Sequence, residues 1–270
     1  VFAVAQSLTA PIGAAAADPG GTSQNYWREA LSRWQSVYDT SIFTAQGVWS
    51  PVLIDTVSFR PAAGQLGIAE TYPTVEIYLS YAVTDYTVPD ITFALNRGPS
   101  FPVTPNFTGS VNQVAVSGSS PNQEDITISL TTPFLFDPSL GQDLMMEVFI
   151  GAVPTPPILI AAVPVRTCAY DVAAHRARTV RYIGGAAATA TTGTLTAFTP
   201  VTKFDYTVLP GTASHEPYGA GCYQSARSFY EQFPSTANDL SNKTILAILN
   251  GAGGYTTVPV PAATLAMPTG

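Results

Sequence analysis

Apolar and polar residues alternate along much of the first 210 positions of this 270-residue chain. In residues 75–80 (VEIYLS), aliphatic residues take every second position, and glutamate, tyrosine and serine stand between them. A period of two predicts a β-strand with one buried face. Clusters of Pro, Gly, Asn or Asp separate most of these segments, as expected for turns. We expect about ten strands, which include residues 52–59, 74–83, 111–118, 124–134, 143–153, 158–165, 176–185, 193–198 and 203–209.

Two segments have a less simple pattern. Residues 24–43 fit both helical and strand spacing, and we expect a short helical turn over 24–31 followed by a strand. In residues 52–59, strict alternation assigns four residues to each face. One face then carries Leu53, Asp55, Val57 and Phe59, and the other carries Val52, Ile54, Thr56 and Ser58.

The phrase FDPSLG predicts a turn that leads into a strand. Asp137-Pro138 favours turn initiation, and Gly141 can adopt a positive φ. After the turn, Leu144, Met146 and Val148 return to a single face of the sheet. Asp137 and Asp143 flank this turn and could bind Ca²⁺ together with backbone carbonyls. Solvated turn carboxylates are the favoured interpretation.

The strand pattern predicts an all-β protein, a jelly-roll-like β-sandwich with an extended N-terminal strand and a C-terminal tail. We divide the chain into an N-terminal strand and tether (1–23), the sandwich (24–210) and a C-terminal extension (211–270). Charged residues make up 11% of the sequence, and there are 23 Pro and 21 Gly. This composition is typical of strands joined by turns.

The first twelve residues, VFAVAQSLTAPI, also read as a strand. Its large side chains, Phe2, Val4, Leu8 and Ile12, share one face, and small residues occupy the other. Such a strand can enter a groove on a neighbouring copy, or it can be the first strand of its own sheet. The sequence leaves both alternatives open.

The charge balance excludes two classes of partner. The net charge is −7, and the chain contains two lysines, Lys203 and Lys243. Without a basic patch, binding to nucleic acid or to anionic membranes is not expected. The uncharged stretch 148–165 contains four prolines, which break a helix, so we do not expect it to span a membrane.

Two cysteines, Cys168 and Cys222, suggest one disulfide bond in an exported protein. The bond would join the C-terminal extension to the main domain. Two buried free thiols are the alternative. We also expect a secretion signal upstream of the sequence, and therefore a secreted, extracellular or cell-surface protein.

The sequence offers little catalytic chemistry. A G-x-S-x-G motif is absent, and His215-Glu216 begins no H-E-x-x-H motif because no second His follows. His175 is interpreted as a residue at a strand edge or on the surface. We therefore predict no enzymatic activity, no cofactor and no metal site.

Two features relate to glycans. Asn106 and Asn242 begin N-glycosylation sequons and are candidate modification sites. Trp27, Trp34 and Trp49 could form a platform for stacking sugars, although core packing is the favoured interpretation.

Several phrases resemble a β-sandwich domain of bacterial secreted proteins. They are WQSVYDTSIF, IDTVSFRP, VEIYLS, ITFALNRG and, most strongly, TTPFLFDPSLGQDLMMEV, within residues 33–245. The domain is common in planctomycete surface proteins and in exported proteins with PEP-CTERM-type sorting signals. Members usually have Asn where Gln142 stands. The resemblance implies an exported, envelope-associated β protein and supplies no catalytic residues.

These observations favour a structural protein that assembles with copies of itself into a filament, sheath or surface layer by exchange of terminal strands. The alternative is a cell-surface carbohydrate-binding module, with surface glycans as partners.

Overall fold

The computed structural model describes residues 5–16, 27, 31–66, 69–152, 168–169, 175–209, 246–249 and 255–258. The chain divides into two compact units. One is Val4–Val208, and the other combines Leu209–Gly270 with Val1–Ala3. In the second unit, β13 (Leu246–Leu249) and β14 (Tyr255–Val258) form an antiparallel pair.

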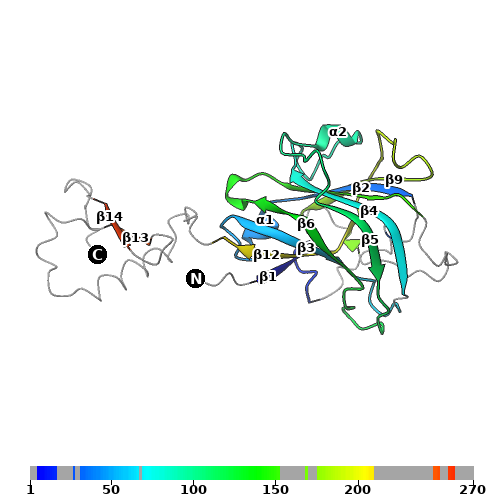
Figure 1. The fold of residues 1–270 in the computed structure, drawn as a ribbon, viewed down its shortest axis with the longest axis horizontal. Helices are drawn as coiled ribbons and strands as arrows, with labels where there is room; N and C mark the ends of the chain where they lie inside the picture. Colours follow the sequence, from blue (N-terminus) through cyan, green and yellow to red (C-terminus); the bar gives the residue numbers. More distant parts are fainter. Residues whose placement is uncertain are drawn as a thin grey trace, which may run out of the picture. The chain divides into compact units, whose positions relative to one another are not determined.

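The larger unit is all-β, as the alternating pattern predicts, and its main element is one antiparallel sheet of ten strands (Figure 1). Their order in the sheet is β1-β12-β3-β6-β5-β4-β7-β2-β9-β10. The strands are β1 (Ala5–Ala10), β2 (Ser32–Tyr38), β3 (Val52–Phe59), β4 (Glu70–Tyr81), β5 (Phe107–Gln113), β6 (Ile126–Phe136), β7 (Leu144–Ile150), β9 (Ala177–Ile183), β10 (Thr194–Thr196) and β12 (Thr202–Val208). The short elements are β8 (Cys168–Ala169), β11 (Thr199–Pro200), α1 (Ser41–Thr44), α2 (Phe93–Asn96) and a 3-10 helix, η1 (Pro138–Leu140).

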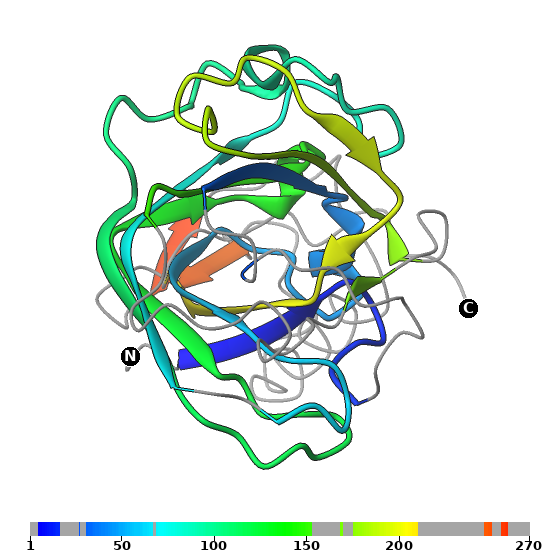
Figure 2. The ribbon, with the colours of Figure 1, turned by 90° about the vertical axis from the view of Figure 1, so that its right-hand side faces the viewer.

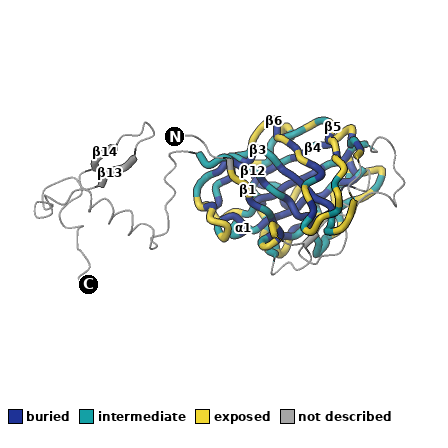
Figure 3. Tube along the Cα trace, turned by 90° about the horizontal axis from the view of Figure 1, so that it is seen from below, coloured by how far each residue is buried: buried dark blue, intermediate teal, exposed yellow. Residues whose placement is uncertain are grey.

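The sheet is curled around its hydrophobic core. Figure 2 shows strands from both ends of the strand order on opposite sides of the interior. At the β5–β6 junction a single residue pair, Gln113 and Ile126, joins the neighbouring strands. Strands on both sides of this junction contribute to one core cluster, with Phe204 from β12 and Trp34 from β2 among its members. Figure 3 shows that buried residues follow the strands, whereas exposed residues are frequent in the connections.

Alternation predicts the faces of β4 correctly. Val75, Ile77 and Leu79 are fully buried in the core, and the polar residues between them lie on the outer face. β2 is buried on both faces, since Gln35 and Val37 are as fully buried as Trp34 and Tyr38. The strand expected after residue 31 ends at Tyr38, and Ile42 lies in α1 instead. The helical turn expected over 24–31 and the strand expected over 158–165 lie largely or wholly outside the described residues.

The face assignment for β3 is wrong. In the β3–β12 ladder, Tyr206 pairs with Ile54 and Asp205 pairs with Thr56, so Asp55 is the extra residue, and the β3–β6 ladder is irregular at the same place. Such a bulge reverses the alternation, because one additional residue turns all later side chains to the opposite face. As a result, Val52 and Ile54 share the core with Val57 and Phe59.

The turn before β7 forms as predicted. Asp137 accepts a hydrogen bond from the backbone N–H of Ser139 at 2.9 Å, and Gly141 has a φ of 67°. Leu144, Met146 and Val148 then enter the core together. Across the part of the chain that the structure describes, no helix has the length and apolarity to cross a membrane.

Candidate functional site

The N-terminal strand lies at one edge of its own sheet. β1 pairs antiparallel with β12, and Leu8 stands opposite Phe204. Leu8 is 4% exposed and belongs to the core, and Ile12 packs against the core from beyond the strand. Phe2 and Val4 lie outside the described residues. Within a single chain, β1 is thus the first strand of its own sheet, which is one of the two alternatives that the sequence left open. Exchange of β1 between copies remains a prediction.

Few side-chain contacts hold this edge strand in addition to the ladder. The Tyr206 hydroxyl donates to Gln6 Oε1 at 3.1 Å, and Gln46 Nε2 donates to the backbone oxygen of Thr9 at 3.1 Å. Because β1 is the first strand in the sheet order, its outer edge faces no further strand of the described sheet. Edges of this kind are common sites of strand exchange.

A second feature lies on the outer face of the sheet, over β4, β7 and β2. There the side chains surround a hollow of about 440 Å³. Its lining combines charged, aromatic and small residues. We call it the polar hollow, and it is lined by Arg33, Glu76, Tyr78, Arg97, Phe101, Val103, Glu147, Phe149 and Ala188.

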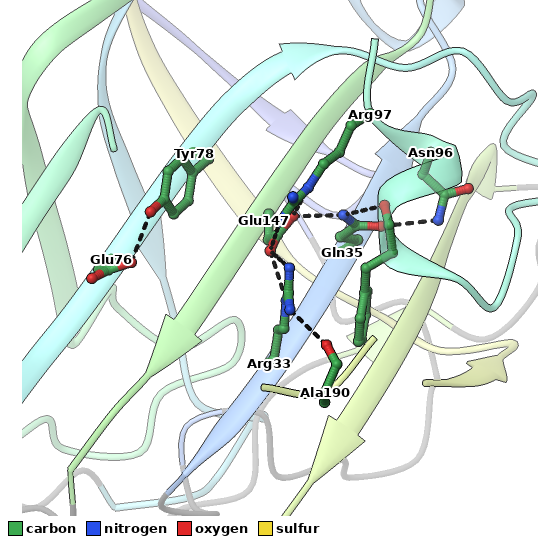
Figure 4. Close-up of polar contacts among 9 residues, drawn as sticks. Arg33, Gln35, Glu76, Tyr78, Asn96, Arg97, Glu147 and Ala190 are labelled. Carbon is green, nitrogen blue, oxygen red and sulfur yellow. Dashed lines mark hydrogen bonds and ion pairs between the residues drawn. The ribbon is translucent and has the colours of Figure 1, made fainter. Parts of the chain in front are cut away.

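Glu147, on β7, is the central acceptor beside the polar hollow (Figure 4). Arg97 donates to it through Nε at 3.0 Å and Nη2 at 2.8 Å, and Arg33 donates through Nε at 2.7 Å. Gln35 Nε2 donates at 2.6 Å. Glu147 is 2% exposed, so a carboxylate here requires these donors to offset the loss of hydration.

The same cluster attaches two connections to the sheet. Asn96, in α2, donates to Gln35 Oε1 at 2.9 Å, and Gln35 donates to the backbone oxygen of Phe93 at 3.0 Å. Arg33 Nη1 donates to the backbone oxygen of Ala190 at 2.7 Å. The connection that contains α2 and the one before β10 are therefore both held by β2 side chains.

Aromatic rings support both guanidinium groups. Arg97 Cζ lies 4.0 Å from the centroid of the Phe101 ring, and Arg33 Cζ lies 4.5 Å from that of Phe93. The rings of Phe101 and Tyr78 stack at 5.1 Å. Stacking on a ring fixes the plane of a guanidinium and leaves its edge for hydrogen bonds.

Tyr78 donates to Glu76 Oε2 at 2.8 Å, the remaining polar contact drawn in Figure 4. Burial raises the pKa of Tyr78 to about 12, and the hydrogen bond to Glu76 adds to this increase. The phenol therefore remains a neutral hydrogen-bond donor at physiological pH.

The cluster around Glu147 is not among the sites predicted from the sequence. A signal was present, because Glu147 interrupts the apolar run LMMEVFI, and Arg33 and Gln35 alternate with the buried face of β2. A buried carboxylate in a strand requires cationic or hydrogen-bonding partners. The sequence gives no direct indication of which strands supply them.

The candidate glycosylation site Asn106 is 4% exposed. Its side-chain nitrogen donates to the backbone oxygen of Thr132 at 2.9 Å, and its oxygen accepts from the N–H of Leu79 at 2.7 Å. Attachment of a glycan in the folded state requires this buried nitrogen to become accessible. Asn242 lies outside the described residues.

Two of the three tryptophans lie in the core. Trp27 and Trp34 are fully buried, with ring centroids 5.7 Å apart, and so do not form an exposed platform. Trp49 is 44% exposed and lines a smaller hollow of about 150 Å³ together with Gln6 and Val208.

The remaining predicted site residues are not brought together by the described structure. Cys168 lies in β8, and Cys222 is outside the described residues, so the disulfide remains a prediction. Asp143 accepts from the backbone N–H groups of Thr40 and Tyr86, at 3.0 and 2.9 Å. Asp137 accepts within its own turn instead. In the described portion of the chain, His, Cys, Asp and Glu residues form no group of three suited to a metal ion.

Comparisons with protein-family models, curated protein sequences and solved structures found no match.

Proposed function

We propose that this chain is a secreted structural subunit that assembles with copies of itself into a filament, sheath or surface layer through exchange of β1. The observation that supports the proposal is the position of β1 at an open edge of the sheet, in a defined register with β12. The two facing parts of the curled sheet also support the proposed jelly-roll-like sandwich classification.

Exchange preserves the contacts that β1 makes. If β1 of one copy enters the sheet of the next, Leu8 again lies opposite Phe204, and six residue pairs form the same ladder. The free energies of the closed and exchanged states then differ mainly through chain entropy. Because each copy donates a strand and accepts another, the exchange can continue without closing into a dimer.

The core contribution of β1 is small enough for the strand to separate. Its fully or nearly buried apolar side chains are Leu8 and Ala10, whereas other strands, α1 and connecting residues supply the rest of the cluster. Burial of one leucine contributes about 2 kcal/mol. Separation of β1 is therefore a local opening, and unfolding of the remaining sheet is not required.

Exchange occurs only when β1 of a neighbouring copy competes successfully with the chain's own β1 for the same sheet edge. A strand that is covalently linked to its own sheet competes there at an effective concentration of about 1 mM. Exchange thus needs copies at comparable local concentration, or additional contacts between them. A layer of copies held side by side at a cell surface meets the first condition, and a surface with few charges reduces repulsion within it.

A cross-strand cysteine pair tests the proposal. Ser7 and Asp205 are paired across β1 and β12, so Ser7→Cys with Asp205→Cys can form a disulfide within a chain or between exchanged chains. The double variant is assembled under reducing conditions, oxidised and run on a non-reducing gel. Exchange predicts a ladder of covalent oligomers on the gel. Wild-type protein is run beside the variant, because Cys168 and Cys222 can also form disulfides between chains.

The matched control pairs Thr71→Cys with Asn112→Cys, which face each other across β4 and β5. This pair is expected to close within single chains in the same assembly. Two results would overturn the proposal: oxidised monomers alone from the Ser7/Asp205 variant, or wild-type protein that stays monomeric in light scattering at every accessible concentration. Deletion of residues 1–20 is expected to leave a folded unit that does not assemble.

A further inference from the structure

We propose that the polar hollow binds one ring of a neutral sugar, as part of a glycan that continues beyond the hollow. This inference does not depend on strand exchange. It rests on the charge balance of the lining, on the polar atoms that remain available there, and on the apolar walls beside them.

The charges of the lining cancel, since two guanidinium groups face two carboxylates. Both arginines are already bound to Glu147, and the lining holds no cation besides these two. Val103, fully exposed, and the exposed Ala188 show that the hollow is open to solvent. Ion pairs with a ligand are weakened by water in such a place, so a neutral ligand is favoured.

Two polar atoms can still take up hydrogen bonds. Among the described residues, Arg97 Nη1 and Glu76 Oε1 have no hydrogen-bond partner, while their neighbouring atoms are held by Glu147 and Tyr78. The guanidinium can only donate, and the carboxylate can only accept. Sugar hydroxyls do both, so different hydroxyls of one glycan can satisfy the two groups.

The apolar part of the lining fits the C–H groups of a sugar ring. Phe101, Val103 and Phe149 supply it, and the volume of about 440 Å³ lies in the usual range for small-molecule sites. The charged groups are positioned before a ligand arrives, because Glu147 and the ring of Phe101 hold Arg97 in place. Because the Arg97 side chain is already held in place, binding costs less side-chain conformational entropy.

The test uses the ¹⁵N-labelled full chain, titrated separately with the methyl glycosides of glucose, galactose, mannose and N-acetylglucosamine. Glucuronate and glycine serve as the charged probes. We expect at least one neutral glycoside to shift the amide signals of Ala188 and Phe101 and the Arg97 Nε–H signal saturably, with a dissociation constant of about 1 mM. The charged probes should bind more weakly than that glycoside.

Variants distinguish binding in the hollow from binding elsewhere. Ala188→Trp is expected to fill the hollow and weaken binding at least tenfold, and Glu76→Gln should weaken it several-fold. Ala186→Trp is the matched control, because Ala186 is exposed in the same turn and does not line the hollow. Tighter binding of glucuronate or glycine, unchanged affinity in Ala188→Trp, or no shift with any neutral glycoside would each overturn the proposal.

Discussion

Arg97 forms a two-pronged ion pair with Glu147, with Nε 3.0 Å from Oε2 and Nη2 2.8 Å from Oε1. The planar guanidinium and the carboxylate lie edge to edge, which is the strongest common geometry for such a pair. Arg33 approaches the same carboxylate, with Nη2 2.6 Å from Oε1. One buried carboxylate thus binds two partly buried guanidinium groups.

Replacement of Glu147 by Gln is expected to destabilise the fold. The variant leaves Arg33 and Arg97 without their shared counterion, and breaking a buried ion pair in this way costs about 3 kcal/mol. Urea unfolding followed by tryptophan fluorescence measures the loss. Glu76→Gln serves as the control on the same face, with an expected change of less than about 0.5 kcal/mol.

The contacts of Glu147 also predict which of two substitutions lowers the free energy of unfolding more. Arg97→Met should cost less than Glu147→Gln, because Arg33 and Gln35 still donate to the carboxylate in that variant. If the two variants are equally stable, or if Glu147→Gln matches Glu76→Gln, Glu147 does not have the central role that its contacts indicate.

The pattern of the sequence predicts the strands because alternation is a local property. In β7, Leu144, Met146 and Val148 enter the core, and Met145 and Glu147 face the other way, as a period of two requires. The bulge at Asp55 could not be found in this way. Val52, Leu53 and Ile54 are all apolar, so either face of β3 looks suitable for the core.

The contacts of the polar hollow could not be predicted because they join distant parts of the sequence. Arg33 and Glu147 are separated by 114 positions, and they meet only because β2 and β7 are neighbours in the sheet. Neighbour order depends on the packing of the whole sheet, which one sequence does not reveal directly. The lone glutamate in an apolar strand indicated that partners exist, without indicating which ones.

Asn106 is expected to contribute to stability through its side chain. It accepts from the N–H of Leu79 and donates to the oxygen of Thr132, and thereby links β4 to β6. Asn106→Ala leaves both backbone groups without these partners, at a cost of about 2–3 kcal/mol. Chemical denaturation measures the loss.

Asn112→Ala is the matched control for this prediction. Asn112 is exposed and accepts from the hydroxyl of Thr71 at 2.8 Å. Its replacement should change the free energy of unfolding by less than about 0.5 kcal/mol. Equal losses in the two variants would contradict a structural role for the buried amide of Asn106.

Asp143 should make the stability of the protein depend on pH. Burial is the main cause that raises the pKa of Asp143 from 3.8 to about 6, and repulsion from Asp39 and Asp85 adds to it. The N–H groups of Thr40 and Tyr86 oppose this increase, because they favour the ionised carboxylate.

The sign of the effect follows from the raised pKa. The folded state binds this proton more tightly than the unfolded state, so the contribution is fully present below about pH 4. This contribution is lost as the pH rises to about 6, and above that pH Asp143 causes no further change in the free energy of unfolding. Asp143→Asn carries no charge at any of these pH values and should lack this decrease.

Urea unfolding of wild type and Asp143→Asn at several pH values between 4 and 7 tests the prediction. The Asn variant loses one acceptor for a backbone N–H, so it should be less stable than wild type at pH 4. The difference should then narrow as the pH approaches 6, because only the wild type loses the contribution of a bound proton. Asp137→Asn, in the neighbouring turn, retains Asp143 and should keep the wild-type decrease. Parallel curves for wild type and Asp143→Asn would show that Asp143 does not titrate in this range.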